Sequence, residues 1–179
     1  MHPLRSTVIV AAALSVLAAC GCALRQVNSF AERGLDPSRY HTFGWAAAAA
    51  QSTGDPRIDG NAIFHHLMQA RVDAELTTRG YQKTTAETAD LVVQYYAHVT
   101  QRVDLVGADL VYRACTDCTP YVYDAGSLTI DIVDGRTRVL LWRGWAEGDI
   151  GHIIDNQLAL DHQVGRAVAR ILERLPRGL

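Results

Sequence analysis

The sequence predicts an α+β two-layer sandwich, in which an antiparallel or mixed sheet carries two helices on one face. Three observations support this expectation. A strand with regular alternation covers 91–100, a turn dipeptide separates two further β-prone segments, and apolar residues recur at helical spacing in two places. The resulting order of strand, helix, several strands and helix suits one sheet with both helices on the same side.

The first half of the domain supplies a strand, a helix and a short return strand. The aromatic stretch 40–45 is predicted as the first strand, and the alanine-rich and polar stretch 46–56 as a connection. A helix is predicted over 61–79, with Gly80 just past its C-terminus and a brief strand at 81–84. Its apolar face contains Phe64, Leu67, Met68, Val72 and Leu76.

The second half supplies the best strand, a hairpin and a second helix. In 91–100, one face contains Leu91, Val93, Tyr95, Ala97 and Val99. Segments 128–133 and 139–147 flank Asp134-Gly135, a turn dipeptide whose glycine is expected to supply a positive φ. Asp131 and Asp134 alternate with apolar residues, which predicts a solvated strand face and a turn.

The final segment has the clearest helical periodicity in the chain. Asp155 or Asn156 is placed to cap its start, and Pro176 is placed where the helix should stop. Its apolar positions are Leu160, Val164, Ala167, Val168, Ile171, Leu172 and Leu175.

The N-terminus has the three-part organisation of a secretory signal. A short basic start precedes the apolar run 8–19, which is shorter than the about 20 residues of a membrane span. The stretch Leu17-Ala18-Ala19-Cys20 resembles the bacterial lipobox, which implies cleavage before Cys20 and a diacylglycerol on its thiol. Cys22 fits less well as the acceptor, because the residues before it depart from the pattern. Gly21 after the lipidated cysteine favours sorting to the outer membrane.

These features divide the chain into a signal peptide at 1–19, a lipidated tether at 20–35 and the domain at 36–176. The tether shows no strong periodicity. Several acyl chains make a durable anchor, since each buried methylene contributes about 0.8 kcal/mol. We therefore expect a lipoprotein in the cell envelope, facing the periplasm, that contacts the membrane through its lipid and needs no other cofactor.

Four cysteines occur as two close pairs, Cys20 with Cys22 and Cys115 with Cys118. Four thiolates suit zinc, but a lipidated Cys20 is a thioether and no longer a ligand. A thiol redox site at Cys115 and Cys118 should open a helix, whereas the flanking segments 110–112 and 121–123 are β-prone. A structural disulfide between these two residues, closing a turn between strands in an oxidising compartment, is favoured over a redox site.

Other chemistry has little support in the sequence. The histidines form no metal-binding spacing, no serine lies in a G-x-S-x-G turn, and no glycine-rich loop opens a helix. The net charge of -2 provides no basic field for nucleic acid. We expect neither an enzyme nor a metal site.

The domain resembles the bacterial lipoprotein family known as domain of unknown function 4136. The resemblance covers about residues 36–176 and rests on "YHTFGW", "DPRID", "VDAELTTRGY", "ADLVVQYYAHV", "GSLTIDIVDGRTRVLLWRGWAEGDI" and "ILERLP". It implies a lipidated secretory start and no established catalytic residues. Between 106 and 125 the sequence departs from the family, whose members often carry a glycine- and tyrosine-rich loop there.

Trp142-Arg143-Gly144 matches a recurrent motif of that family. Packing of the tryptophan under a helix, with an outward arginine and a glycine that permits close approach, is favoured over ligand contact. The first functional hypothesis is a non-catalytic binding or scaffolding module, whose exposed strand faces, with residues such as Val92, Tyr96, Val133 and Trp145, bind an envelope protein or polymer. The alternative is a carrier of a small apolar ligand or lipid.

Overall fold

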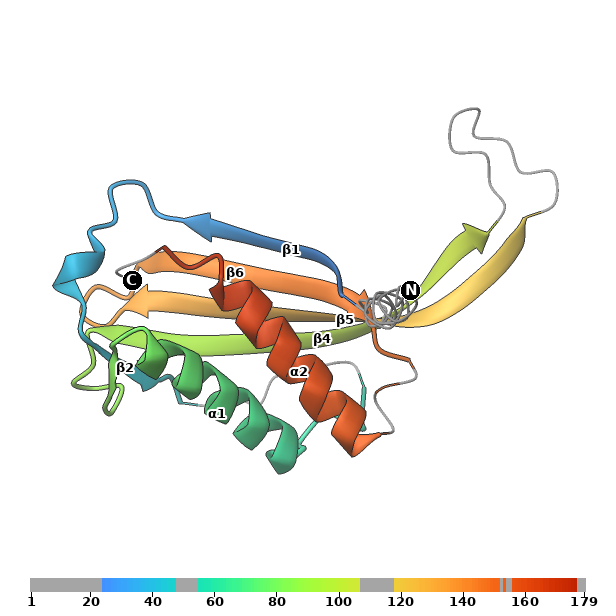
Figure 1. Ribbon diagram of the computed structural model, residues 1–179, viewed down its shortest axis with the longest axis horizontal. Helices are drawn as coiled ribbons and strands as arrows, with labels where there is room; N and C mark the ends of the chain where they lie inside the picture. Colours follow the sequence, from blue (N-terminus) through green and yellow to red (C-terminus); the bar gives the residue numbers. More distant parts are fainter. Residues whose placement is uncertain (1–23, 48–54, 107–117, 152, 154–155, 177–179) are drawn as a thin grey trace, which may run out of the picture.

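The computed structural model describes residues 24–47, 55–106, 118–151, 153 and 156–176. These residues form the predicted α+β two-layer sandwich (Figure 1). In chain order the elements are β1 (Leu24–Ala31), the short 3-10 helix η1 (Pro37–Arg39), β2 (Thr42–Trp45), α1 (Ala62–Thr78), β3 (Gln82–Lys83), β4 (Leu91–Val106), β5 (Thr119–Asp134), β6 (Leu140–Asp149) and α2 (Gln157–Leu172).

The sheet is mixed and has six strands in the order β1-β6-β5-β4-β2-β3. Strands β1, β6, β5 and β4 pair with one another in antiparallel fashion, whereas β2 runs parallel to both β4 and β3. Both helices lie on the same side of this sheet (Figure 1). The opposite side therefore carries no helix from the described part of the chain.

Local signals in the sequence define where the helices begin and end. The side chain of Asn61 accepts a hydrogen bond from the Phe64 amide at 3.1 Å, and Asn156 caps α2 in the same way. At the end of α1, Gly80 has a left-handed backbone conformation, with φ 97°. The amides of Gly80 and Tyr81 bond to the carbonyls of Thr77 and Leu76, which is the Schellman arrangement.

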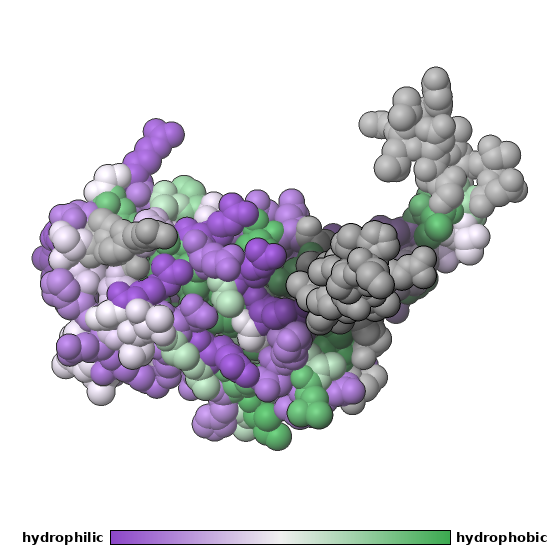
Figure 2. Space-filling view, in the orientation of Figure 1, coloured by the Kyte–Doolittle hydropathy of each residue, from purple (hydrophilic) through white to green (hydrophobic). Residues whose placement is uncertain are grey.

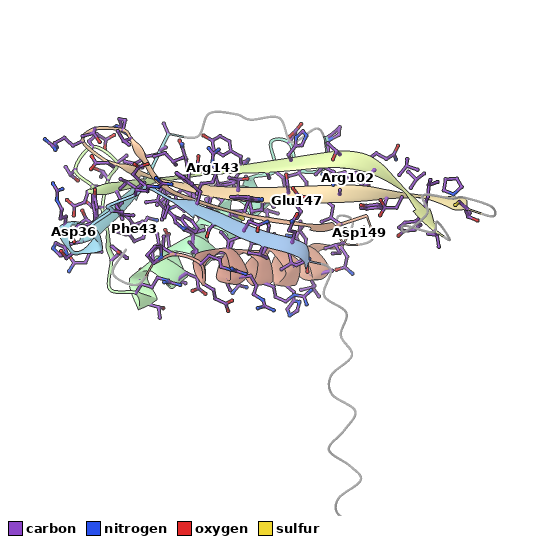
Figure 3. All side chains as sticks on the ribbon, turned by 90° about the horizontal axis from the view of Figure 1, so that it is seen from above. Asp36, Phe43, Arg102, Arg143, Glu147 and Asp149 are labelled. Atoms are coloured by element: carbon purple, nitrogen blue, oxygen red, sulfur yellow. The ribbon has the colours of Figure 1, made fainter. Side chains whose placement is uncertain are left out.

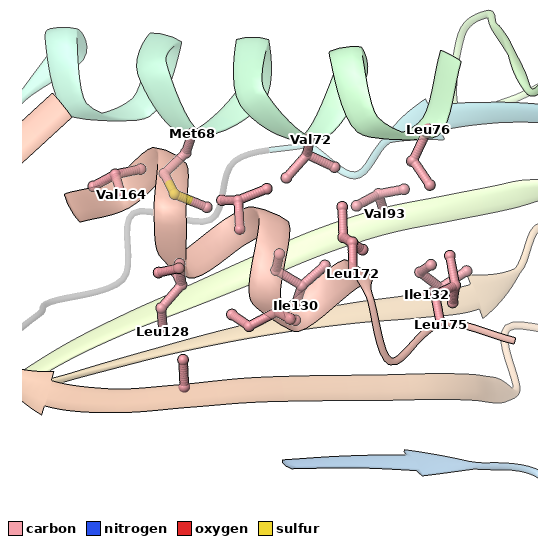
Figure 4. Close-up of a cluster of buried hydrophobic side chains, with 14 of the residues drawn as sticks. Met68, Val72, Leu76, Val93, Leu128, Ile130, Ile132, Val164, Leu172 and Leu175 are labelled. Atoms are coloured by element: carbon pink, nitrogen blue, oxygen red, sulfur yellow. The ribbon is translucent and has the colours of Figure 1, made fainter. Parts of the chain in front are cut away.

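The core lies between the helices and the sheet (Figure 4). From α1 it receives Phe64, Met68, Val72 and Leu76, and from the α2 segment Leu160, Val164, Ala167, Val168, Ile171, Leu172 and Leu175, as the periodicity predicts. The alternating face of β4 meets them as expected, with Leu91, Val93 and Val99 buried and Tyr95 and Ala97 packed at the margin. Burial of these side chains supplies the main driving force for folding.

Residues 24–31 are an edge strand of the sheet, and this corrects the prediction of a tether through residue 35. Strand β1 pairs with β6 from Leu24 opposite Gly148 to Ala31 opposite Trp142. A register shift between Leu24 and Gln26 allows Leu24 and Val27 to pack against the core although they are three residues apart. This bulge removes the two-residue alternation by which a strand is recognised in a sequence.

The turn between β5 and β6 differs in one respect from the prediction. Gly135 does not have a positive φ, and the left-handed residue of this turn is Arg138, with φ 60°. A Cβ on Gly135 would instead lie 2.0 Å from the carbonyl oxygen of Ala89. Glycine is needed here because the turn packs closely against the segment that precedes β4.

Strands β4 and β5 are longer than predicted and project beyond the sheet. Past the pair formed by Ala125 and Asp149, the only strand pairing among the described residues is between β4 and β5, from Gln101 opposite Asp124 to Val106 opposite Thr119. We call residues 101–106 and 119–124 the β4–β5 arm. Figure 1 shows the arm extending away from the two layers.

Candidate binding surface

The side of the sheet without helices presents three rows of side chains across four strands. Each row takes one residue from β1, β6, β5 and β4 in turn, so the side chains of a row are cross-strand neighbours. The rows are Phe30, Arg143, Asp131 and Gln94; Asn28, Trp145, Thr129 and Tyr96; and Gln26, Glu147, Ser127 and His98. We call this surface the helix-free face.

The Trp142-Arg143-Gly144 motif divides its residues between the two sides of β6. Trp142 is fully buried in the core. A Cβ on Gly144 would lie 2.2 Å from the Trp142 ring and 2.6 Å from Ile171 of α2, so a larger residue would displace the helix or the indole. Arg143 points to the helix-free face. Two residues of the motif therefore pack the layers together, and the third belongs to the exposed surface.

Arg143 forms a bidentate ion pair with Asp131 on the neighbouring strand. Its Nε and Nη2 atoms donate to the two carboxylate oxygens, each at 2.6 Å. The Asp131 side chain is only 2% exposed, whereas that of Arg143 is 45% exposed. The hydrogen bond to Asp131 raises the pKa of Arg143. The expectation that Asp131 is solvated is wrong, because Arg143 lies over the carboxylate and satisfies it.

Aromatic side chains lie close to this ion pair on the helix-free face. Trp145 and Tyr96 are half-buried, and Phe30 is 51% exposed. Val92 and Val133, which we expected at an exposed face, are buried. Val92 is buried because the backbone of Thr85 and Ala86 lies over this part of the sheet. It lies close against Gly44, the neighbour of Val92 on β2. That connection covers this end of the face.

The arm has two chemically different faces. On one face, the cross-strand pairs are Gln101 with Asp124 at the base, followed by Val103 with Val122 and Leu105 with Pro120. The side chains of Val103, Val122, Leu105 and Pro120 are exposed and apolar. The opposite face carries the exposed residues Arg102, Asp104, Tyr121, Thr119 and Val106 and the buried Tyr123. Figure 2 shows hydrophobic surface near the end of the arm.

Polar contacts hold the base of the arm against the rest of the domain. Arg102 Nη2 lies 3.7 Å from Glu147 Oε2 of β6, and the Tyr121 hydroxyl donates to Asp149 Oδ2 at 3.4 Å. Figure 3 shows Arg143, Glu147 and Arg102 in succession along the sheet toward the arm. These contacts make the helix-free face continuous with the polar face of the arm.

The "DPRID" motif contributes a contact to the base of the arm that sequence reasoning missed. Arg57 bonds to Asp55 within the motif and reaches Asp124 of β5, with Nη2 3.3 Å from the carboxylate. The hydrogen bond from Arg57 lowers the pKa of Asp55. No spacing in the sequence relates Arg57 to Asp124, because their contact depends on where the β4–β5 pair leaves the sheet.

Two hollows are relevant to the carrier hypothesis. An apolar cavity of about 70 Å³ lies between the sheet and the helices, lined by residues that include Phe64, Val99, Leu160 and Val164. A larger groove of about 570 Å³ lies between β1 and α2, and its lining includes Arg166, Arg170 and Arg174. The apolar hollow is thus small, and the large hollow is rich in cationic side chains.

The predicted sites at the cysteines are not tested by the described residues. Cys20 and Cys115 lie outside the described residues. Cys118 is half-buried and is the first residue of the described range 118–151. The lipid attachment and the disulfide therefore stay predictions. Among the described residues, no group of three or more histidine, cysteine, aspartate or glutamate side chains is arranged to hold a metal ion. Nor is any described helix long and apolar enough to cross a membrane.

The protein is thus a two-layer α+β domain with a mixed sheet, one side of which carries both described helices. Residues 27–177 match the family described as "Domain of unknown function (DUF4136)". The chain belongs to this family, as the sequence motifs predict. The match starts within β1, in agreement with the inclusion of that strand in the sheet. Comparison with curated proteins finds no match.

Several solved structures align with this chain at low sequence identity. A PDZ domain protein from Parabacteroides distasonis aligns with a TM-score of 0.55 and 14% identity over 84% of this chain, which spans only 35% of that protein. The PelC dodecamer from Paraburkholderia phytofirmans aligns at 0.47 and 11% identity over 82% of this chain and 94% of the other. A hemagglutinin homolog from Helicobacter pylori aligns at 0.44 and 14% identity, covering 79% and 86%. At such identities the similarity concerns the fold alone.

Proposed function

We propose that this protein is a non-catalytic binding module of the cell envelope, anchored by lipid on Cys20 to the outer membrane on its periplasmic side. The module docks a partner protein through the helix-free face. The observation that carries the proposal is the combination of Tyr96, Trp145 and the exposed guanidinium of Arg143 on a surface that neither helix covers.

The composition of this face supports a protein partner. Tryptophan, tyrosine and arginine are the residue types that most often dominate the free energy of protein association. Here the indole and phenol are already half-buried, so each loses little conformational freedom on binding. Asp131 holds Arg143 by two hydrogen bonds, which orients the guanidinium before a partner arrives.

The cavity volume argues against the carrier alternative. Pockets for small ligands commonly measure roughly 300–1,000 Å³. The apolar cavity of about 70 Å³ is far below this range, and the arginine-lined groove does not suit an apolar ligand. The small size of the apolar cavity therefore supports the binding module over the carrier.

Site-specific photocrosslinking in intact cells tests the binding proposal. We expect benzoylphenylalanine in place of Tyr96 to give a discrete protein adduct, identified by mass spectrometry. The matched control places the same residue at Ala70, which is exposed on α1 on the opposite side of the sheet. The adduct should be lost when Arg143→Lys is combined with Trp145→Ala. A diffuse, carbohydrate-containing adduct would instead indicate an envelope polymer, and equal adducts from both positions would contradict a specific surface.

Metabolic labelling tests the anchor separately. The wild-type protein should incorporate radioactive palmitate and sediment with outer-membrane fractions, and Cys20→Ala should do neither. The control, Cys22→Ala, should behave as the wild type. Labelling that persists in Cys20→Ala would show that the lipid is attached elsewhere.

A further inference from the structure

The apolar face of the β4–β5 arm is unusual for a domain of this size. Val103, Leu105 and Val122 are 61%, 56% and 52% exposed, and Pro120 pairs with Leu105 beside them. These four residues form one continuous patch, because cross-strand pairs at alternate positions lie side by side. Grouped apolar side chains on an otherwise polar surface indicate a surface that something covers.

The chain that precedes β1 indicates what lies nearby. Four residue steps separate Cys20 from Leu24, so their Cα atoms are at most about 14 Å apart. Leu24 pairs with Gly148, and Gly148 pairs with Gly126, two residues from the base of the arm at Asp124. Neighbouring strands are separated by about 4.8 Å. A lipid on Cys20 would therefore hold the membrane surface close to the end of the sheet from which the arm projects.

We propose that the apolar face of the arm lies on the lipid bilayer and, together with the lipid on Cys20, fixes the orientation of the domain on the membrane. This inference rests on the anchor of the proposed function but not on the helix-free face. Two of the three charged residues of the arm, Arg102 and Asp104, alternate with the apolar residues and project from the opposite face. The third, Asp124, lies at the base of the apolar face, where it pairs with Arg57 of the domain.

The free edges of the arm limit how deeply it enters the bilayer. Among the described residues, the two strands pair only with each other beyond the Asp124 carbonyl, which accepts from the Ile150 amide, so the remaining backbone groups on their outer edges require water. Such edges are not tolerated in the hydrocarbon region. The ribbon therefore lies along the interface with its backbone at the level of the headgroups, and only the apolar side chains reach the acyl chains.

Fluorescence quenching by brominated lipids tests this arrangement. The lipidated, full-length mature protein carrying Leu105→Trp is reconstituted into vesicles of phosphatidylethanolamine and phosphatidylglycerol, and the emission of the unsubstituted protein is subtracted. We expect a blue shift of the added tryptophan. We also expect stronger quenching by lipids brominated near the headgroup end of the acyl chain than by lipids brominated near its terminus. The matched control is Val139→Trp, which is 52% exposed before substitution but lies in the turn at the opposite end of β6.

The possible outcomes distinguish the proposal for the arm from the proposal for the lipid anchor. Protein that floats with the vesicles but shows equal, weak quenching at both positions overturns the arm proposal and leaves the anchor intact. Protein that fails to float overturns both. An added tryptophan shielded from aqueous iodide but not quenched by brominated lipid would mean that a second copy covers the arm, which also overturns the proposal. A shielded and quenched Leu105→Trp beside an unshielded Val139→Trp supports it.

Discussion

Asp131 shows how a single residue determines the chemistry of an exposed sheet face. A buried carboxylate is costly unless it is paired and hydrogen-bonded. Both of its oxygens are satisfied by Arg143, so the ion pair is a structural element as well as part of the candidate surface. Changes at Arg143 must therefore be judged for stability before they are judged for binding.

We expect Arg143→Ala to lower the free energy of unfolding by about 2 kcal/mol. Removing one partner of a buried pair costs about 3–5 kcal/mol, but here the arginine is nearly half exposed, and water entering its place reduces the cost. Urea unfolding measures the change. Combining Arg143→Met with Asp131→Leu should recover much of the loss, because no charge is then left unpaired. A change below about 0.5 kcal/mol for the alanine variant would contradict this account.

Gly144→Ala should also destabilise the domain, by about 1–3 kcal/mol, because the added methyl overlaps the Trp142 ring and Ile171. Thermal and urea unfolding measure the effect. Gly151→Ala is the matched control, since its nearest contact would be an ordinary 3.6 Å to Asp149. Equal stability of the two variants would show that α2 shifts freely on the sheet.

At the scale of elements, the turn between β5 and β6 is organised by Asp134. Its Oδ1 accepts from the amides of Arg136 and Thr137 at 2.9 and 2.7 Å, and its Oδ2 accepts from the Tyr40 hydroxyl at 3.1 Å. These bonds favour the ionised form and lower the pKa of Asp134, the largest contribution coming from the Thr137 amide. The stability of this turn therefore depends on the ionisation of the Asp134 carboxyl group.

This coupling predicts how stability depends on pH. A carboxyl with a lowered pKa binds fewer protons in the folded state, so its contribution is complete above the unfolded pKa of about 3.9 and is lost as the pH falls through the lower folded pKa. We expect Asp134→Asn to keep the turn, because an amide oxygen also accepts hydrogen bonds, and to reduce the loss of stability between pH 4 and pH 2, measured by urea unfolding. An unchanged pH profile would mean that other carboxyls determine the acid sensitivity.

Elements whose own sequence shows periodicity or capping residues were predictable. Elements whose position depends on pairing with a distant strand were not. The periodicity of α1, β4 and α2 identified their buried residues, and asparagine and glycine marked the helix ends. The bulge in β1 concealed its alternation. A second register shift, between Ile132 and Val133, prevents the pairing of Asp131 with Arg143 from being counted outward from the turn. The candidate surface depends on that pairing, so the motif was recognisable but the ion pair was not.

At the scale of the whole molecule, the inclusion of β1 changes where the domain begins. Strand β1 covers the edge of β6, and the position of the arm relative to the predicted anchor depends on it. A connection shorter than the predicted tether would restrict the orientations of the domain at the membrane.

Two substitutions on β1 test whether this strand is integral to the fold. Val27→Asp should lower the free energy of unfolding by about 2 kcal/mol, because the valine packs against the core. Phe30→Asp on the opposite, exposed face should have little effect. Circular dichroism during urea unfolding measures both. Equal stability of the two variants would restore the tether interpretation.

The pairing of β1 with β6 also has a consequence for biosynthesis. Leu24 and Gly148 lie at opposite ends of the chain, and the strand nearest the predicted anchor is synthesised first but acquires its partner almost last. Contacts between residues so distant in sequence slow folding and prolong the life of incomplete intermediates. During this interval β1 has an unpaired backbone that is able to associate with neighbouring chains. Efficient maturation of this protein therefore depends on keeping its first strand apart from other nascent chains until its last strand has emerged.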